Sequence, residues 1–270
     1  MTLVNELILA LGGIFSGILA GLLGAGGGVI CVPLMLALNY TPIQALGTGC
    51  LAVSIISISG SIQNSRMGYF SPKRVICIGI SAFITTQISV HAVSQIKPYL
   101  LLTTFGILML LLICLVELRK KLTAVPQGSN TSVSSSSKNL PKWINSLLFR
   151  RLMTGSFAGL FAGMVGGGSG SLLVPMQMLI LGESIKVAIQ TSIGVNIITS
   201  TSAWLSHALR GNVLFVEGFL LGVGGFLGAQ VGTRFLPKLP EKFVSTAFNS
   251  LIVILSIYIF GKAWRSYGSF

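Results

Sequence analysis

Two glycine-rich stretches are the part of this chain best suited to bind a ligand. The first is Gly24-Ala25-Gly26-Gly27-Gly28 and the second is Gly166-Gly167-Gly168-Ser169-Gly170, and a Val-Pro pair follows each at the same distance. Glycine permits positive φ angles and close approach of the backbone to a ligand, and a helix that restarts after such a turn presents free N–H groups and a positive dipole end. In apolar surroundings this arrangement predicts a site for a small anion that needs no buried lysine or arginine.

Duplication of the motif favours a binding role. Pro175 follows Pro33 by 142 residues (175 − 33 = 142), so the motif occurs once in each half of the chain. The alternative is that the glycines only let helices pack closely, as small residues do in membranes. Duplicated breaks in apolar helices are typical of the binding sites of transporters.

Uncharged polar side chains recur at matched positions near the two turns. The stretch Ala45-Leu46-Gly47-Thr48-Gly49 corresponds to Ala188-Ile189-Gln190-Thr191-Ser192 at an offset of 143 residues (191 − 48 = 143). Neutral donors suit an oxyanion that must be released again, although hydrogen bonding between helices is the commoner role of such side chains in membranes. The predicted substrate-binding residues are Gly26, Gly27, Gly28, Thr48, Gly168, Ser169, Gly170, Gln190, Thr191, Ser192 and Asn196.

The composition is that of a membrane protein. The 270 residues are 52% hydrophobic and 9% charged, with a mean hydropathy of +0.87, and several apolar segments reach the roughly 20 residues that a bilayer crossing requires. All 5 acidic residues are glutamates close to segment ends, which argues against a carboxylate proton relay inside the membrane. We expect a multi-pass protein of the cell membrane that retains its first segment, because no signal-peptide n-region or cleavage site is present.

Each half contains five apolar segments, and a polar linker joins the halves. The segments lie at about 5–23, 26–39, 42–63, 75–94 and 98–117, and then at about 152–168, 171–182, 186–208, 216–236 and 243–262. Gly68 and Gln87 match Gly211 and Gln230 at the same 143-residue offset. We therefore divide the chain into a first repeat at 1–117, a serine-rich linker at 118–150 and a second repeat at 151–270.

An odd number of segments per repeat turns the second copy upside down in the membrane. The expected fold is an all-α polytopic membrane protein with about ten transmembrane or re-entrant helices in two inverted five-segment repeats. The second segment of each half is short, so we expect it to dip into the bilayer or to form a hairpin with its predecessor. Inversion brings the glycine turn of each half towards the Ala-x-x-Thr stretch of the other half.

The basic residues predict the orientation. Fourteen of the 18 lysines and arginines fall on one side of this topology, which places that side and the linker in the cytoplasm and both termini outside. The same distribution explains the net charge of +13 without nucleic acid as a partner. The expected partners are a small anionic substrate and the lipid bilayer, with the coupling ion, a proton or a sodium ion, left open.

Other chemistries fit these residues less well. The four cysteines lie in apolar segments without paired spacing, so we assign them no role in metal binding or redox chemistry and expect no cofactor. The glycines lack the preceding strand and the Gly-Lys-Ser/Thr of nucleotide sites. Ser169 with His207 resembles the serine and histidine of rhomboid intramembrane proteases. We expect a transporter and no enzyme; an intramembrane serine protease and a non-transporting membrane assembly protein are the alternatives.

The repeated motifs resemble those of the TauE/SafE sulfite exporter family. The resemblance rests on both glycine turns with their Val-Pro pairs, on both Ala-x-x-Thr stretches, and on His207…Gly211-Asn212-Val213 and Gly228…Gly232-Thr233-Arg234. The first half departs from the family pattern where Thr85 and Ser89 replace the second set of glycines. Membership implies a secondary transporter, an exporter or permease, of small sulfur-containing oxyanions such as sulfite, thiosulfate or organosulfonates.

Overall fold

The structure is a computed structural model that describes residues 3–24, 26–95, 147–166 and 169–240, together with residues 100 and 107 and scattered positions from 242 to 261. The helices are α1 (Leu3–Leu23), α2 (Gly28–Ala37), α3 (Pro42–Arg66), α4 (Pro72–Val93), α6 (Leu147–Val165), α7 (Gly170–Ile180), α8 (Ile185–Ala208) and α9 (Phe215–Phe235), and α9 continues into the 3-10 turn η1 (Leu236–Lys238). Among the described residues the regular secondary structure is all helical, which confirms the expected class.

These helices coincide with eight of the ten predicted segments. The predicted segment 98–117 lies almost wholly outside the described residues, and segment 243–262 is described only at scattered positions. Most of the linker and the end of the chain also lie outside the described residues. α6 begins at Leu147, inside the stretch that we expected to be linker.

Matched sequence signals set the starts of the two long central helices. Thr41 forms a capping box with Gln44 ahead of α3, and the Ser184 hydroxyl accepts a hydrogen bond from the Val187 N–H, 3.5 Å away, ahead of α8. Side-chain oxygens at these positions satisfy backbone donors that have no partner within the helix. Thr41 and Ser184 again differ by 143 positions (184 − 41 = 143).

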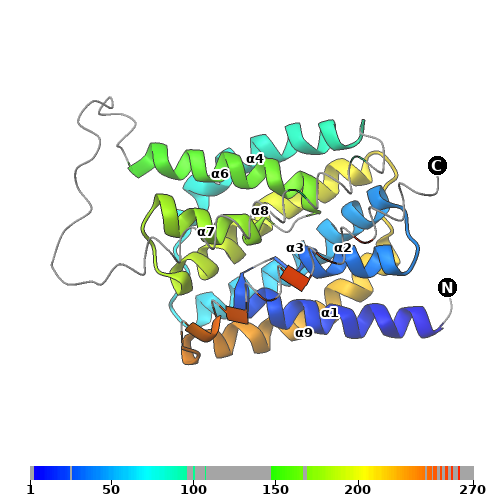
Figure 1. The fold of residues 1–270 in the computed structure, drawn as a ribbon, viewed down its shortest axis with the longest axis horizontal. Helices are drawn as coiled ribbons and strands as arrows, with labels where there is room; N and C mark the ends of the chain where they lie inside the picture. Colours follow the sequence, from blue (N-terminus) through cyan, green and yellow to red (C-terminus); the bar gives the residue numbers. More distant parts are fainter. Residues whose placement is uncertain are drawn as a thin grey trace.

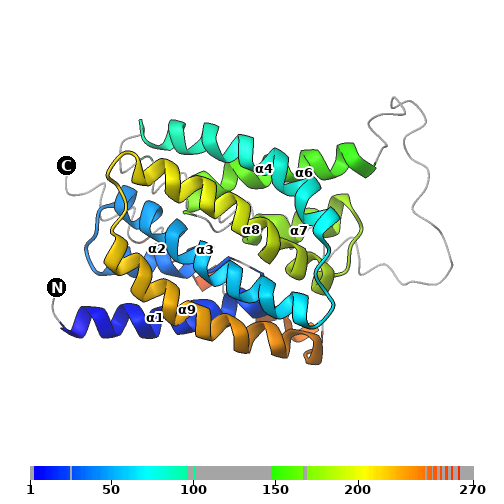
Figure 2. The same cartoon turned by 180° about the vertical axis from the view of Figure 1, so that it is seen from behind.

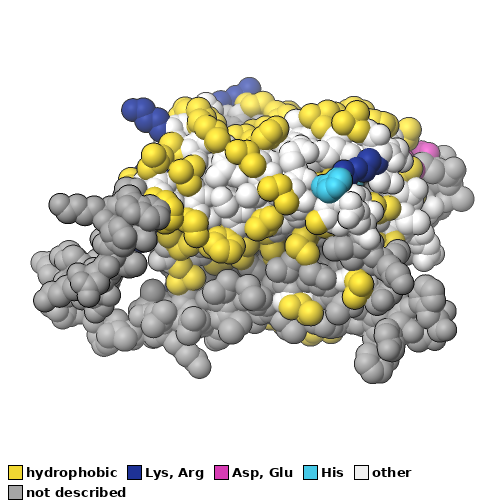
Figure 3. Space-filling model, turned by 90° about the horizontal axis from the view of Figure 1, so that it is seen from above, with side chains coloured by type: hydrophobic (Ala, Val, Ile, Leu, Met, Phe, Trp, Pro, Cys, Tyr) yellow, Lys and Arg dark blue, Asp and Glu magenta, His cyan; other side chains and the backbone are white. Residues whose placement is uncertain are grey.

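Four described helical stretches are long and apolar enough to cross a membrane. They are Asn5–Leu23, Pro42–Arg66, Pro72–Val93 and Phe215–Lys238, with mean hydropathies between 1.4 and 2.0. α2 and α7 have 10 and 11 residues, so each is about 15 Å long, roughly half of a bilayer core. This confirms that the second segment of each half is short. Figure 3 shows apolar side chains spread over the face above α4 and α6, with basic side chains near its ends.

The helices form one bundle in which the corresponding helices of the two halves run in opposite directions. Figures 1 and 2 show α1, α3 and α9 running from the end where the N-terminus lies towards the other end, while α4, α6 and α8 run the other way. α3 packs against α8, α1 packs against α9, and α4 packs against α6. Each outer helix pair thus combines one helix from each half.

Glycines bring the outer helix pairs into backbone contact. A Cβ atom added at Gly17 of α1 would lie 2.1 Å from the carbonyl oxygen of Gly225 in α9. A Cβ atom added at Gly159 of α6 would lie 2.2 Å from the carbonyl oxygen of Ala82 in α4. α4 therefore packs closely on α6, although it carries serine and threonine where α9 has glycine. One of these side chains makes a contact between the helices, because the Ser89 hydroxyl donates a hydrogen bond to the carbonyl of Leu160, 2.5 Å away.

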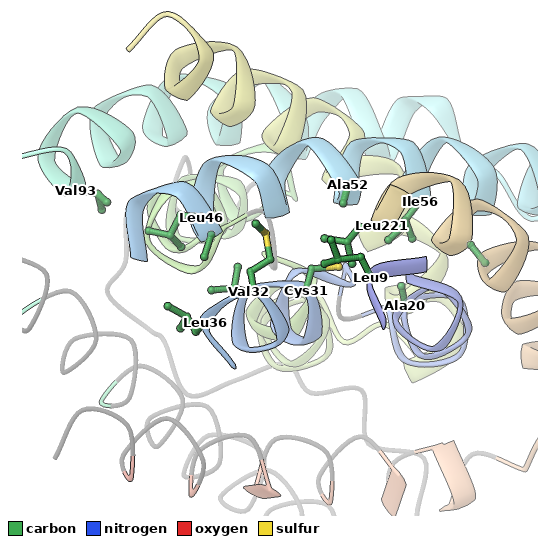
Figure 4. Packing of buried hydrophobic residues seen from close by; sticks show 13 residues of the cluster. Leu9, Ala20, Cys31, Val32, Leu36, Leu46, Ala52, Ile56, Val93 and Leu221 are labelled. Carbon is green, nitrogen blue, oxygen red and sulfur yellow. The ribbon is translucent and has the colours of Figure 1, made fainter. Parts of the chain in front are cut away.

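The short helix α2 fills the space between the longer helices. Figure 4 shows Cys31 and Val32 of α2 in one apolar cluster with Leu46 and Ala52 of α3 and with Leu221 of α9. Burial of these side chains fixes α2 inside the bundle, so the turn that precedes it is also held near the centre.

Candidate functional site

The first glycine turn breaks the chain between α1 and α2. Gly24, Gly26 and Gly27 have φ angles of 66°, 79° and 69°, a region that side chains with a Cβ atom rarely adopt. The Ser16 hydroxyl of α1 donates a 2.9 Å hydrogen bond to the carbonyl of Gly27 and holds the turn against α1. α2 begins at the next residue, so the positive end of its dipole faces this turn.

Hydroxyl and amide groups lie at the second turn, which joins α6 and α7. Gly166 has a φ angle of 73°, while Gly167 and Gly168 lie outside the described residues. The Ser169 hydroxyl donates to the Asn196 side-chain oxygen and lies 3.2 Å from the Thr199 hydroxyl. Asn196 is fully buried, and its amide nitrogen has no hydrogen-bond partner.

The two turns meet each other. A Cβ atom added at Gly170 would lie 1.7 Å from the carbonyl oxygen of Gly24 and 2.9 Å from the amide nitrogen of Asn196. Only glycine fits at this contact, because a side chain there would overlap the backbone of the other half.

Each turn also lies against the matched stretch of the other half. A Cβ atom added at Gly24 would lie 2.9 Å from the Cα of Ile189, and one added at Gly166 would lie 3.2 Å from the Cα of Leu46. Ile189 and Leu46 belong to the two Ala-x-x-Thr stretches. Each turn therefore contacts the predicted stretch of the other half at Ile189 or Leu46, while its approach to Thr191, Ser192 or Thr48 stays a prediction.

A narrow hollow without room for a water molecule lies at the first turn, and residues of both halves line it. Its lining residues are Ala20, Gly21, Gly26, Ile56, Ser57, Gly60, Ile193 and Ala229. Apart from Ser57, its walls are apolar or glycine. Polar contacts for an anion in this hollow would come from backbone groups and the Ser57 hydroxyl.

Some of the predicted site residues have hydrogen-bond partners within the chain. The Thr48 hydroxyl accepts a 3.0 Å hydrogen bond from the Leu214 N–H, just ahead of α9. The Ser192 hydroxyl donates to the carbonyl of Ala188, 2.7 Å away, within its own helix. Gln190 and Thr191 are buried beside Ile189, with 7% and 5% of their surface exposed. A ligand role for all of them remains a prediction.

Gln177 is a buried polar residue that the sequence reasoning missed. Its amide nitrogen lies 3.0 Å from the Ser192 hydroxyl and donates to it, and its side-chain oxygen has no partner. The signal was its position: it is the amide-bearing residue of the apolar helix α7, two residues after Pro175.

The contacts of Ser169 do not support the protease alternative. Its hydroxyl pairs with Asn196 and Thr199, and both ring nitrogens of His207 are without a hydrogen-bond partner. A serine protease requires a base within hydrogen-bond reach of its serine.

The comparison with known families agrees with this geometry. The family described as "Sulfite exporter TauE/SafE" matches residues 9–259. The chain belongs to the TauE/SafE family. Membership and the apolar helices together indicate a membrane transporter.

Curated TauE/SafE-like relatives align over nearly the whole chain. A probable membrane transporter protein YunE of Bacillus subtilis is 22% identical over 262 residues, which cover 93% of this chain and 96% of the relative. YdhB of the same organism is 26% identical over 86% of this chain and 90% of its own length. YfcA of Escherichia coli K12, also a probable membrane transporter protein, is 24% identical over 92% and 87%. No solved structure matches the chain.

Proposed function

We propose that this TauE/SafE protein is a secondary transporter of small sulfur-containing oxyanions, such as sulfite, thiosulfate or organosulfonates, across the cell membrane. The observation that carries the proposal is the contact between the two glycine turns beside the free amide of Asn196. A buried amide donor without an acceptor destabilises a protein by about 1–3 kcal/mol, and an oxyanion at the contact would satisfy it.

The neutral character of the site suits transport. Oriented N–H groups, hydroxyls and a helix dipole attract an oxyanion without a full opposite charge, which would be expensive to bury. A ligand held in this way is also released more easily than one paired with arginine. The predicted ligands from both halves, including Thr48, Thr191 and the glycines of both turns, belong to this proposed site.

We infer that residues 1–117 and 151–270 are inverted repeats that share this site. Matched contacts support the inference. The Gln87 side chain of α4 donates a 3.1 Å hydrogen bond to the Ser202 carbonyl of α8, and the Gln230 side chain of α9 donates a 3.2 Å hydrogen bond to the Ser59 carbonyl of α3. Both the donors and the acceptors differ by 143 positions (230 − 87 and 202 − 59).

A second pair of matched contacts supports the same relation. The Tyr40 hydroxyl lies 3.4 Å from a carboxylate oxygen of Glu217, and the Arg74 guanidinium lies 3.7 Å from the Glu183 carboxylate. Tyr40 matches Glu183 and Arg74 matches Glu217 at the same offset, although the chemistry of the pairs differs. Burial, with a smaller contribution from the Glu217 carboxylate, raises the pKa of Tyr40.

Alternating access follows from two inverted halves around one closed site. The hollow at the first turn is narrow, so the substrate reaches the centre only after the bundle opens at one end. We propose that the end with both termini faces outside and that the linker faces the cytoplasm, from the basic residues.

Uptake by liposomes tests the function. Purified protein is reconstituted and supplied with labelled sulfite, thiosulfate, sulfate or taurine, with protein-free liposomes and the Gly26→Val variant as controls. Valine opposes the φ angle of 79° at this position and occupies the space at the turn. We expect saturable uptake of at least one sulfur oxyanion by the wild type and none by a folded variant. Absence of uptake of all four anions by folded wild-type protein would overturn the proposal.

A further inference from the structure

Two buried polar side chains at matched positions have no hydrogen-bond partner. His207 in α8 and Asn64 in α3 differ by 143 positions (207 − 64 = 143) and have no exposed surface. Both ring nitrogens of His207 and both side-chain polar atoms of Asn64 are unpaired. Buried groups of this kind are rare in folded proteins, so two at equivalent places call for a ligand or an alternative state.

The backbone around the two residues is also equivalent. The Asn212 N–H donates to the carbonyl of His207, 3.0 Å away, and the Tyr69 N–H donates to the carbonyl of Asn64, 2.9 Å away. Each residue thus precedes a tight turn that follows a long central helix. Because α3 and α8 run in opposite directions, these turns lie at opposite ends of the bundle (Figures 1 and 2).

Helical spacing connects each residue to the centre. Asn196, Ser200 and His207 lie at i, i+4 and i+11 on α8, and Ser57, Ser61 and Asn64 lie at i, i+4 and i+7 on α3, so each set follows one face of its helix. All six are buried.

The wall of the central hollow continues towards Asn64. Ser57 and Gly60 line the hollow, and the unpaired Ser61 hydroxyl follows on the same helix. The Thr233 hydroxyl, also unpaired, lies 3.3 Å from a Cβ atom added at Gly60. Free hydroxyls therefore extend from the centre towards the end of the bundle that contains Asn64.

Basic residues stand next to both positions. Arg210 follows His207 by three residues, and its guanidinium lies 3.2 Å from the Val90 carbonyl and 3.0 Å from the His91 ring nitrogen. Arg66 follows Asn64 by two residues. Exposed cations at the two ends of the bundle raise the local concentration of anions there.

We propose that His207 and Asn64 are the two outer subsites of the transport path, which bind the oxyanion as it enters and leaves the central site. This inference rests on the proposed function. The imidazole N–H and the amide N–H groups are neutral donors like those at the centre. His207 serves the end of the bundle where α1 begins, and Asn64 serves the opposite end, where α6 begins. Each becomes accessible only when its own end of the bundle opens, which explains why both are buried and unpaired in the closed structure.

Cysteine accessibility tests the two subsites separately. In a background with the four native cysteines replaced by alanine, His207→Cys or Asn64→Cys is treated with the anionic reagent methanethiosulfonate ethylsulfonate from one side of the membrane. Ala52→Cys and Val195→Cys are matched controls, because both are fully buried in apolar clusters on the same two helices. We expect the His207→Cys variant to react only from outside and the Asn64→Cys variant only from the cytoplasmic side. Taurine should slow both reactions, and the two control variants should not react.

Labelled-anion uptake by the same proteoliposomes separates the two claims. The subsites alone are overturned if the protein transports the anion but both cysteines are inert, or if both react from the same side. The proposed function is overturned if the wild-type protein takes up none of the labelled anions. If a cysteine variant does not fold, His207→Asn and His207→Leu replace it. Asparagine keeps a donor and should hold the KM within about threefold, while leucine should raise it about tenfold or more. Equal KM values for the two variants would contradict the proposal.

Discussion

Asn196 is the side chain on which the proposed anion site depends most. Its side-chain oxygen accepts a hydrogen bond from the Ser169 hydroxyl. The amide nitrogen of Asn196 therefore points towards Gly170 and has no acceptor. An aspartate of similar shape would present an oxygen in the same place and repel an anion. Both the amide and its orientation therefore matter.

Replacing Asn196 should weaken anion binding. Asn196→Leu keeps a similar volume but removes the donor, and loss of a hydrogen bond to a charged ligand costs about 1.5–3 kcal/mol, or roughly a 10- to 100-fold loss of affinity. Thr154→Ala in α6 is the control, because that buried hydroxyl donates within its own helix to the carbonyl of Arg150. Equilibrium binding to purified protein measures both, and equal affinities for the two variants would contradict the role of Asn196.

Thr48 should affect stability as well as binding. Its hydroxyl accepts a hydrogen bond from the Leu214 N–H, so Thr48→Val leaves that donor unpaired and should lower the free energy of unfolding by about 1 kcal/mol. Thr48→Ser keeps the acceptor and should restore the melting temperature. Thermal unfolding in detergent checks this, and an unchanged melting temperature for Thr48→Val would show that the contact does not contribute to stability.

At the scale of helices, the glycine contacts determine how closely α1 and α9 approach. Gly17 faces the carbonyl of Gly225, whereas Gly12 on the same helix faces the end of the Leu34 side chain, with 2.2 Å between an added Cβ atom and Leu34 Cδ2. Backbone cannot move aside locally, but a leucine side chain can change its rotamer.

The two glycines should therefore respond differently to alanine. Gly17→Ala should destabilise the protein by about 1–3 kcal/mol, the usual range for overpacking, and Gly12→Ala by clearly less. Melting temperatures of the two purified variants give the comparison. If Gly12→Ala is as destabilising as Gly17→Ala, the close backbone contact is not what holds α1 against α9.

The helices were predictable from the sequence because long apolar runs separated by Gly, Pro and polar turns leave little choice in a membrane protein. The helix α6 begins at Leu147, five residues before the predicted segment, and it includes Arg150 and Arg151. Arginine side chains at a helix end can reach the interface while the backbone remains helical.

The candidate site was predictable in outline but not in its contacts. The repeat alone was enough to bring each glycine turn to the matched stretch of the other half. Which hydroxyls face the centre depends on the rotation of each helix, which packing sets. Sequence reasoning therefore did not foresee that Thr48 contacts Leu214 or that Gln177 contacts Ser192.

At the scale of the whole molecule, the outer helix pairs each join one half to the other. A movement that opens the bundle at one end must therefore slide or tilt α1 with α9 against α4 with α6. The glycine contacts within each pair favour movement of the pairs as rigid bodies, with the central helices α3 and α8 between them. This is the behaviour expected of a carrier and not of a continuously open channel.

Counterflow tests the central claim, that one site is exposed alternately to the two sides. Proteoliposomes are loaded with an excess of the unlabelled transported anion and diluted into a trace of the labelled anion, without an ion gradient. A carrier with a single shared site should accumulate label transiently above its equilibrium level, and the Asn196→Leu variant should reduce this overshoot. Label that only rises to equilibrium, at a rate that does not saturate with anion concentration, would contradict the account.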